Sequence, residues 1–229
     1  MKIIIIKPFQ VLVIMQNSID ENAMKYLGEG LANCVNLTSL KINLQSNRIN
    51  ENKIKYLAIG ISSLTNLVSL DINLLHNNID ENGVKYLEES ISNLINLVSL
   101  NINLSNNKID ENSVKYLGKG LSSLINLSFL GINLQFNNIC DYSIKYLAEG
   151  LSKCINLNSL NLNIQRKMDR QDIGNIVKYL IEGLQKCSNL NLLMINQGYS
   201  KMHELLIYDS IYKQFTTKLK RLIKLKIQH

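Results

Sequence analysis

The sequence predicts an α/β solenoid in which a unit of about 30 residues is stacked repeatedly. Tyrosine recurs at this interval, at Tyr26, Tyr56, Tyr86, Tyr116 and Tyr146. Within each interval, a stretch of alternating apolar and polar residues precedes a stretch with the apolar spacing of a helix. A single strand or helix of this kind cannot bury its apolar face alone, and stacking the units buries all of these faces together.

The strand of the repeat is predicted from the alternation of Leu100, Ile102 and Leu104 with Asn101 and Asn103. The same alternation returns in the neighbouring repeats. We therefore expect a parallel sheet whose apolar side chains face the helices and whose polar side chains face solvent.

An asparagine recurs at one position of the turn after the strand: Asn17, Asn47, Asn77, Asn107 and Asn137. Buried backbone groups need hydrogen-bond partners, and an inward-pointing carboxamide can supply them. We expect this column to be a structural ladder and not a binding site.

The helix of the repeat is predicted to begin after Asp110, an N-cap residue, with Glu111 in the first turn. Its apolar stripe comprises Val114, Leu117, Leu121 and Leu124. On the outer surface, each lysine that precedes a repeated tyrosine is expected to pair with an acidic residue four positions earlier. Each of these tyrosine rings is expected to rest on a glycine of the neighbouring turn.

The pattern LxxLxIxLxxNxI followed by a helix resembles the leucine-rich repeat, most closely the long-repeat subclass exemplified by ribonuclease inhibitor. This resemblance implies a horseshoe arc with the parallel sheet on the concave side and the helices on the convex side. The pattern is two residues longer than the family's usual LxxLxLxxNxL, which predicts a longer strand. We expect a single domain over residues 1–229. It has clear repeats over about 9–158, a degenerate repeat with an insertion over 159–198, and a helix and last strand over 199–229.

Cysteine usage favours a reducing compartment. Cys34, Cys154 and Cys187 occupy a core column that leucine fills in the other repeats. Buried reduced thiols are therefore expected, and they predict a cytoplasmic protein.

The N-terminal apolar run is cut by Lys7 and Pro8 and is too short to cross a bilayer. As the exposed end of a solenoid without a polar cap, it is expected to promote self-association.

A protein-binding surface is predicted on the concave side, because side chains there change from repeat to repeat while core positions keep one chemistry. The candidate residues are Lys41, Asp71 and Asn101 in one column, Gln45, Leu75 and Gln135 in a second, and His76, Phe136 and Arg166 in the adjoining loops. Leu75 and Phe136 are the candidate apolar anchors.

No motif for a nucleophile, a metal or a phosphate group occurs, so we expect a non-catalytic module without a cofactor or small-molecule substrate. Two other functions stay open. The resemblance also implies regulators of enzymes, either inhibitors or activators of small GTPases. The C-terminal residues 199–229 carry seven basic and two acidic residues, which suits either an anionic surface or a lysine-protected edge strand. Elsewhere the lysines are expected to be balanced by acids, so neither nucleic-acid nor membrane binding is predicted.

Leu117 is assigned to the buried face of the helix and Lys115 to the exposed face. Replacing each by alanine should therefore lower the stability of the fold by different amounts. Leu117→Ala should lower the free energy of unfolding by about 2–5 kcal/mol through lost burial and a cavity. Lys115→Ala should lower it by less than about 1 kcal/mol, because its side chain is exposed. Denaturant titration measures both, and equal losses would show that the faces are assigned wrongly.

Overall fold

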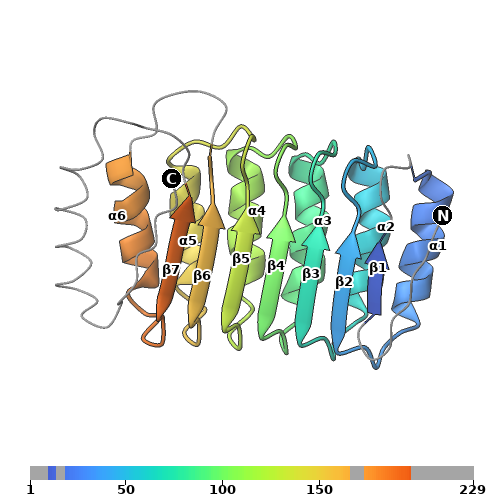
Figure 1. The fold of residues 1–229 in the computed structure, drawn as a ribbon, viewed down its shortest axis with the longest axis horizontal. Helices are drawn as coiled ribbons and strands as arrows, with labels where there is room; N and C mark the ends of the chain where they lie inside the picture. The colour runs from blue at the N-terminus through green and yellow to red at the C-terminus, as the bar shows by residue number, and fades with distance from the viewer. Residues whose placement is uncertain (1–9, 14–18, 166–172, 197–229) are drawn as a thin grey trace.

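The structure, a computed structural model, describes residues 10–13, 19–165 and 173–196. Its strands are β1 (Gln10–Val13), β2 (Ser39–Asn43), β3 (Ser69–Asn73), β4 (Ser99–Asn103), β5 (Phe129–Asn133), β6 (Ser159–Asn163) and β7 (Leu192–Asn196). Its helices are α1 (Glu21–Ala32), α2 (Glu51–Ser62), α3 (Glu81–Ser92), α4 (Glu111–Leu121), α5 (Ser143–Leu151) and α6 (Ile173–Leu184). The strands stand side by side in one layer, and the helices form a second layer behind them (Figure 1).

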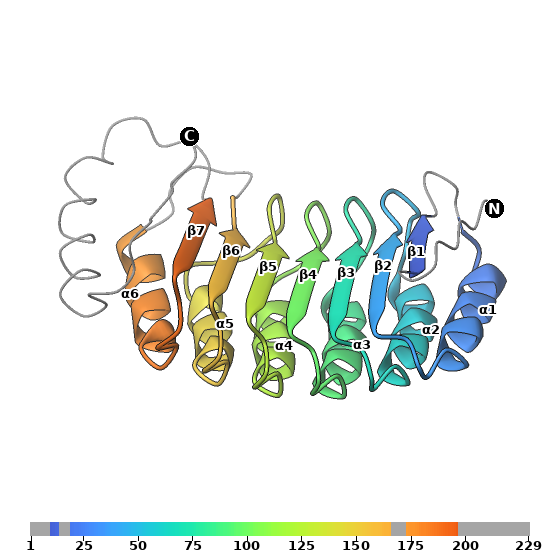
Figure 2. The same cartoon turned by 60° about the horizontal axis from the view of Figure 1, so that its bottom comes forward.

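The described strands form one seven-stranded parallel sheet in chain order. Leu70 pairs with Leu40 on one side and Leu100 on the other, so the register advances by the 30-residue repeat. Between β6 and β7, Leu160 pairs with Leu193, which places three additional residues between these two strands. Sheet and helices lie on opposite sides of the stack (Figure 2). The predicted α/β solenoid with a repeat of about 30 residues is confirmed.

Hydrogen bonding between turns continues past the ends of the regular strands. Leu74 N donates to Asn103 O at 2.8 Å, and His76 N donates to Ser105 O at 3.0 Å. Since β2 to β7 each have five residues, the two additional residues of the repeat form a hydrogen-bonded extension and not a longer regular strand.

Beyond this extension, the turn asparagines connect each turn to the one before it. Asn137 Oδ1 accepts hydrogen bonds from Asn107 N at 3.0 Å and from Ile109 N at 3.1 Å. Its Nδ2 donates to Leu104 O at 2.8 Å and to Leu134 O at 3.1 Å. Asn77 makes the equivalent bonds two repeats earlier. Each carboxamide thus satisfies backbone groups of two turns that have no partner in a regular element.

The core lies between the two layers and is built from the predicted positions. Leu100, Ile102 and Leu104 are buried, as are Val114, Leu117 and Leu121 of α4. Asp110 caps this helix by accepting a hydrogen bond from Ser113 N at 2.9 Å, and Ser113 Oγ accepts one from Asp110 N. Because α4 ends at Leu121, Leu124 belongs to the following turn and not to the helix, although it is fully buried.

Glycines in the helix layer allow the helix backbones to approach closely. A Cβ on Gly150 would lie 2.0 Å from Gly118 O, and one on Gly60 would lie 2.4 Å from Gly28 O. The predicted seating of tyrosine rings on these glycines is therefore wrong, since a neighbouring helix backbone occupies that space. Helices usually pack about 8–10 Å apart, whereas strands lie about 4.8 Å apart, and this mismatch bends the stack. Close helix approach limits that bend.

Two glycines of the same column supply a matched test of this packing. Gly150→Ala should lower the free energy of unfolding by about 1–3 kcal/mol, because the new methyl group meets backbone that cannot rotate away. A Cβ on Gly30 has nothing within 4 Å. Gly30→Ala should therefore be neutral or stabilise by up to about 1 kcal/mol through helix propensity. Denaturant titration compares them, and similar values would refute the close approach.

Candidate functional site

The candidate site is the concave face, defined as the sheet surface opposite the helices. One column of this face forms a continuous polar chain. Lys41 Nζ lies 2.8 Å from Asp71 Oδ2, and Asn101 Nδ2 donates to Asp71 Oδ1 at 3.0 Å. These side chains come from β2, β3 and β4, so register places them side by side. The structure brings these three predicted residues together.

The polar chain ends at Gly131 of β5, which has no side chain to continue it. A Cβ at this position would lie 2.4 Å from Asn101 Oδ1 and 3.6 Å from a ring carbon of Phe129. The carboxamide of Asn101 and the ring of Phe129 therefore share the space above the Gly131 backbone. The Phe129 side chain remains 37% exposed. An aromatic ring and a hydrogen-bond acceptor thus adjoin on the concave face, over the buried Gly131.

Sequence reasoning missed Phe129. In the neighbouring repeats its position is occupied by Ser39, Ser69, Ser99 and Ser159. A single aromatic residue in a column of serines was the available signal. It is recognisable only once this column is known to face solvent on the concave side.

In the second predicted column, the backbone of each residue is held by the asparagine two positions earlier, at the end of the strand. Asn73 Oδ1 accepts a hydrogen bond from Leu75 N at 3.1 Å, and Asn133 Oδ1 accepts one from Gln135 N at 3.0 Å. Gln45 Oε1 accepts a hydrogen bond from Asn73 Nδ2 at 3.1 Å. Gln45, Leu75 and Gln135 are each half-buried. Leu75 is thus less accessible than an exposed anchor would be.

The loop column adopts a left-handed backbone. Ser46, His76, Asn106 and Phe136 have φ between 54° and 57°. Asparagine tolerates this conformation, but for a bulky residue such as Phe136 it is strained. The Phe136 side chain is 38% exposed, and the Asn106 carboxamide contacts the His76 ring at Nδ1. Arg166 and Asn17 lie outside the described residues.

On the helix layer, Lys55 and Lys115 contact a tyrosine of the next turn, whereas Lys25 pairs with Glu29 of its own helix. Lys55 Nζ lies 5.7 Å from the ring centre of Tyr86, and Lys115 Nζ lies 5.6 Å from that of Tyr146. In the described helices α1 to α4, no ion pair joins such a lysine to the acid four residues earlier, so this predicted pairing is wrong. A hydrogen bond to the Tyr142 hydroxyl at 3.1 Å raises the pKa of Lys145.

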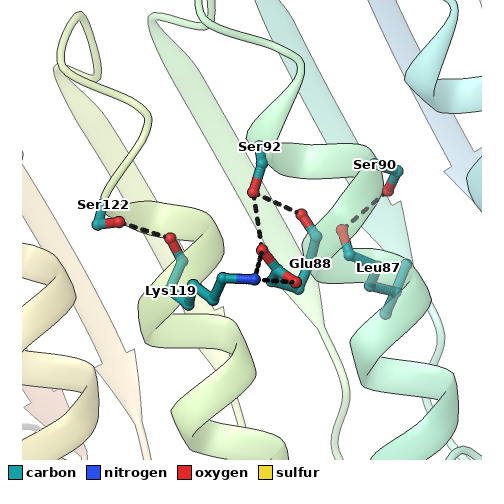
Figure 3. Close-up of polar contacts among 6 residues, drawn as sticks. All are labelled: Leu87, Glu88, Ser90, Ser92, Lys119 and Ser122. Carbon is teal, nitrogen blue, oxygen red and sulfur yellow. Dashed lines mark hydrogen bonds and ion pairs between the residues drawn. The ribbon is translucent and has the colours of Figure 1, made fainter.

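Glu88 is a buried carboxylate at a position of the helix layer where α1, α2, α4 and α5 have Gly or Ala (Figure 3). Glu88 is 3% exposed, and its Oε1 lies 3.2 Å from Lys119 Nζ of the next helix. Ser92 Oγ donates to Glu88 Oε1 at 3.0 Å. Gly120 makes room, because a Cβ there would lie 3.3 Å from the Glu88 Cα. The Glu88 carboxylate is paired with Lys119 and accepts a hydrogen bond from Ser92. We interpret it as a contact that links α3 to α4.

The thiols and acids of the described residues offer no metal centre, since no group of three or more His, Cys, Asp or Glu converges there. Burial raises the pKa of Cys154 to about 12 and that of Cys187 to about 11. Cys34 is only partly buried, which differs from the prediction. No helix among residues 19–165 and 173–196 is long and apolar enough to cross a membrane.

No model of a known protein family matches the sequence, and no curated protein matches it significantly. Among solved structures, internalin C2 from Listeria monocytogenes is 14% identical, with 90% of this chain and 92% of that chain covered and a TM-score of 0.33. A second L. monocytogenes internalin is 16% identical, with coverages of 95% and 85% and a TM-score of 0.22. A leucine-rich-repeat protein from Leptospira interrogans is 11% identical, with coverages of 87% and 86% and a TM-score of 0.15. With TM-scores this low, nothing that these proteins do is transferred to this chain.

The thiol environments predict two reactivity classes. At mildly alkaline pH, Cys154 and Cys187 remain protonated and buried, so they should react with iodoacetamide only after unfolding. Cys34 and Cys140 are partly exposed and should react in the native state. Mass spectrometry of labelled peptides separates the classes. Native labelling of Cys187 as fast as Cys34 would contradict the packing around α6.

Proposed function

We propose that the chain is a non-catalytic protein-binding module and that the concave face receives the partner. The observation that carries the proposal is the junction of Phe129, Gly131 and Asn101. Aromatic residues ringed by polar groups are frequent centres of protein interfaces. The ring of Phe129 offers apolar contact area, and the Asn101 carboxamide beside it offers a hydrogen-bond acceptor.

The polar chain beside this junction supports an orienting role. The Lys41 side chain is 57% exposed, and an exposed ion pair contributes only about 0–1 kcal/mol to stability. The pair therefore has little structural value for the fold. It holds Asp71 and, through it, Asn101 in one geometry, so Asn101 Oδ1 is directed at a partner before binding. Preorganised groups lose little entropy on binding.

The remaining concave positions are less available to a partner. The asparagines Asn43, Asn73, Asn103 and Asn133 each accept a hydrogen bond from the backbone two residues later. They keep the same chemistry in each turn and so carry no discrimination. We therefore assign selectivity to the column of Lys41, Asp71 and Asn101, and to Phe129 and Phe136 at the two ends of β5.

Two roles stay as alternatives within this proposal. Binding on the concave face is compatible with regulating an enzyme, and the identity of the partner decides this. Binding of an anionic surface depends on residues 199–229, which lie outside the described residues. The buried thiols support a cytoplasmic location, which we propose together with the binding role.

Phe129→Ser and Phe136→Ser should each weaken the partner complex about tenfold or more, because each removes an exposed ring from the interface. A partner captured with the intact chain is purified, and its dissociation constant is measured by calorimetry for each variant. Circular dichroism verifies that the variants fold.

The matched control is Ile59→Ser, which removes a 54% exposed apolar side chain from α2. It should leave the dissociation constant unchanged. Loss of binding in the control, with normal binding by both phenylalanine variants, would place the partner on the helix layer and refute the proposal.

A further inference from the structure

A row of exposed apolar residues follows the edge at which helices lead into strands, the lower edge in Figure 1. We call it the isoleucine rim: Val35, Ile95, Ile125 and Ile155, with exposures of 50%, 54%, 53% and 51%. Thr65 and Ser188 occupy the same place in the two other described turns. Exposed apolar rows of this kind mark interaction surfaces more often than isolated exposed residues do.

The rim is held by a second asparagine ladder. Asn126 Nδ2 donates to Ile95 O at 3.0 Å, and Asn156 Nδ2 donates to Ile125 O at 2.9 Å. Asn66 and Asn96 make the equivalent bonds to Val35 O and Thr65 O. These bonds fix the backbone of Val35, Ile95 and Ile125, and β-branched side chains have few rotamers. The rim is therefore rigid before it meets a partner.

Charge is almost absent from this edge. In the six segments 32–38, 62–68, 92–98, 122–128, 152–158 and 185–191, Lys153 and Lys186 are the charged residues. The whole chain carries a net charge of +7, so two copies repel each other in general. Two copies meet with least repulsion where the charges are missing. Depletion of charge is also typical of interface cores.

We infer that the isoleucine rim binds a second copy of this chain through a twofold axis at Ile125. Antiparallel pairing about this axis places Ile95 opposite Ile155 of the second copy and Ile125 opposite its own equivalent. The next positions place Thr65 opposite Ser188 of the second copy. The three isoleucines thus meet apolar residues and the two polar positions meet each other, while Val35 lies beyond the paired positions.

The spacing of the rim favours a second copy over an unrelated protein. Its side chains recur with the repeat of the stack, and another stack of the same repeat matches that spacing at each position. A twofold arrangement needs such a self-complementary surface. The rim lies at one edge of the sheet, so this contact leaves the concave face free.

Sedimentation velocity of the full chain over a wide concentration range tests the inference. The wild type should show a concentration-dependent dimer. Ile125→Lys places two like charges across the axis and should raise the dissociation constant by more than about 100-fold. Ile59→Lys adds the same charge to α2 and should leave the dimer intact. If Ile125→Lys does not fold, Ile125→Ser, which should still weaken the dimer, takes its place.

Cross-linking locates the axis. Ile125→Cys should form a covalent dimer on mild oxidation, because residues at a twofold axis lie close to their own equivalents. Ile59→Cys and the wild type, with its partly exposed Cys34 and Cys140, should not.

Three results would overturn the inference. The first is a wild type that stays monomeric at all concentrations. The second is a dimer that Ile125→Lys leaves unchanged, which would implicate another surface such as the N-terminal apolar run. The third is a monomeric wild type that binds phosphatidylcholine vesicles and loses this binding in Ile125→Lys, which would make the rim a lipid contact.

Discussion

The hydrogen bonds of the turn asparagines Asn47, Asn77, Asn107 and Asn137 are the interaction on which the rest of this structure depends. After each strand the chain must leave the sheet and enter a helix, and its backbone groups there have no partner in a regular element. The carboxamide of Asn137 supplies one acceptor and two donors at this point and bonds to two turns. It thereby fixes the register of the strands, and the register decides which side chains share a column.

In the helix layer, the distance between neighbouring helices depends on the size of the side chains between them and not on hydrogen bonds. Gly60 and Gly150 let neighbouring helix backbones touch. Glu88 takes the place that Gly28 and Gly118 hold in other turns, and its local surroundings compensate for the larger charged side chain: Lys119 neutralises the carboxylate, Ser92 donates to it and Gly120 leaves space. A buried charge would be costly without these partners. Substitution in one turn is thus compensated by its immediate neighbours, as expected for a stack in which each turn contacts only the next.

The concave face and the isoleucine rim have different side-chain patterns, and each pattern suits a different kind of partner. On the concave face the column of Lys41, Asp71, Asn101 and Gly131 changes chemistry at each step, which suits one particular partner. On the isoleucine rim the chemistry is repeated, which suits a surface with the same period. The left-handed backbone at His76 and Phe136 adds a further feature to the concave side, because strain at such residues is retained only where surrounding contacts enforce it.

From the sequence alone followed the fold class, the core columns and the structural asparagines, because these depend on a period that the letters display directly. Asp110 as N-cap and the burial of Leu117 follow from spacing within one repeat, and the structure agrees with both. Contacts between turns could not be read in this way. Lys55 and Lys115 reach the tyrosines of the next turn, Gly60 and Gly150 face helix backbone, and Asn101 reaches the space above Gly131. Each of these contacts joins residues about 30 positions apart, and only the distance between stacked backbones decides which side chains meet. The sequence by itself therefore determined what lies inside each turn, and the tertiary structure decided what each surface presents.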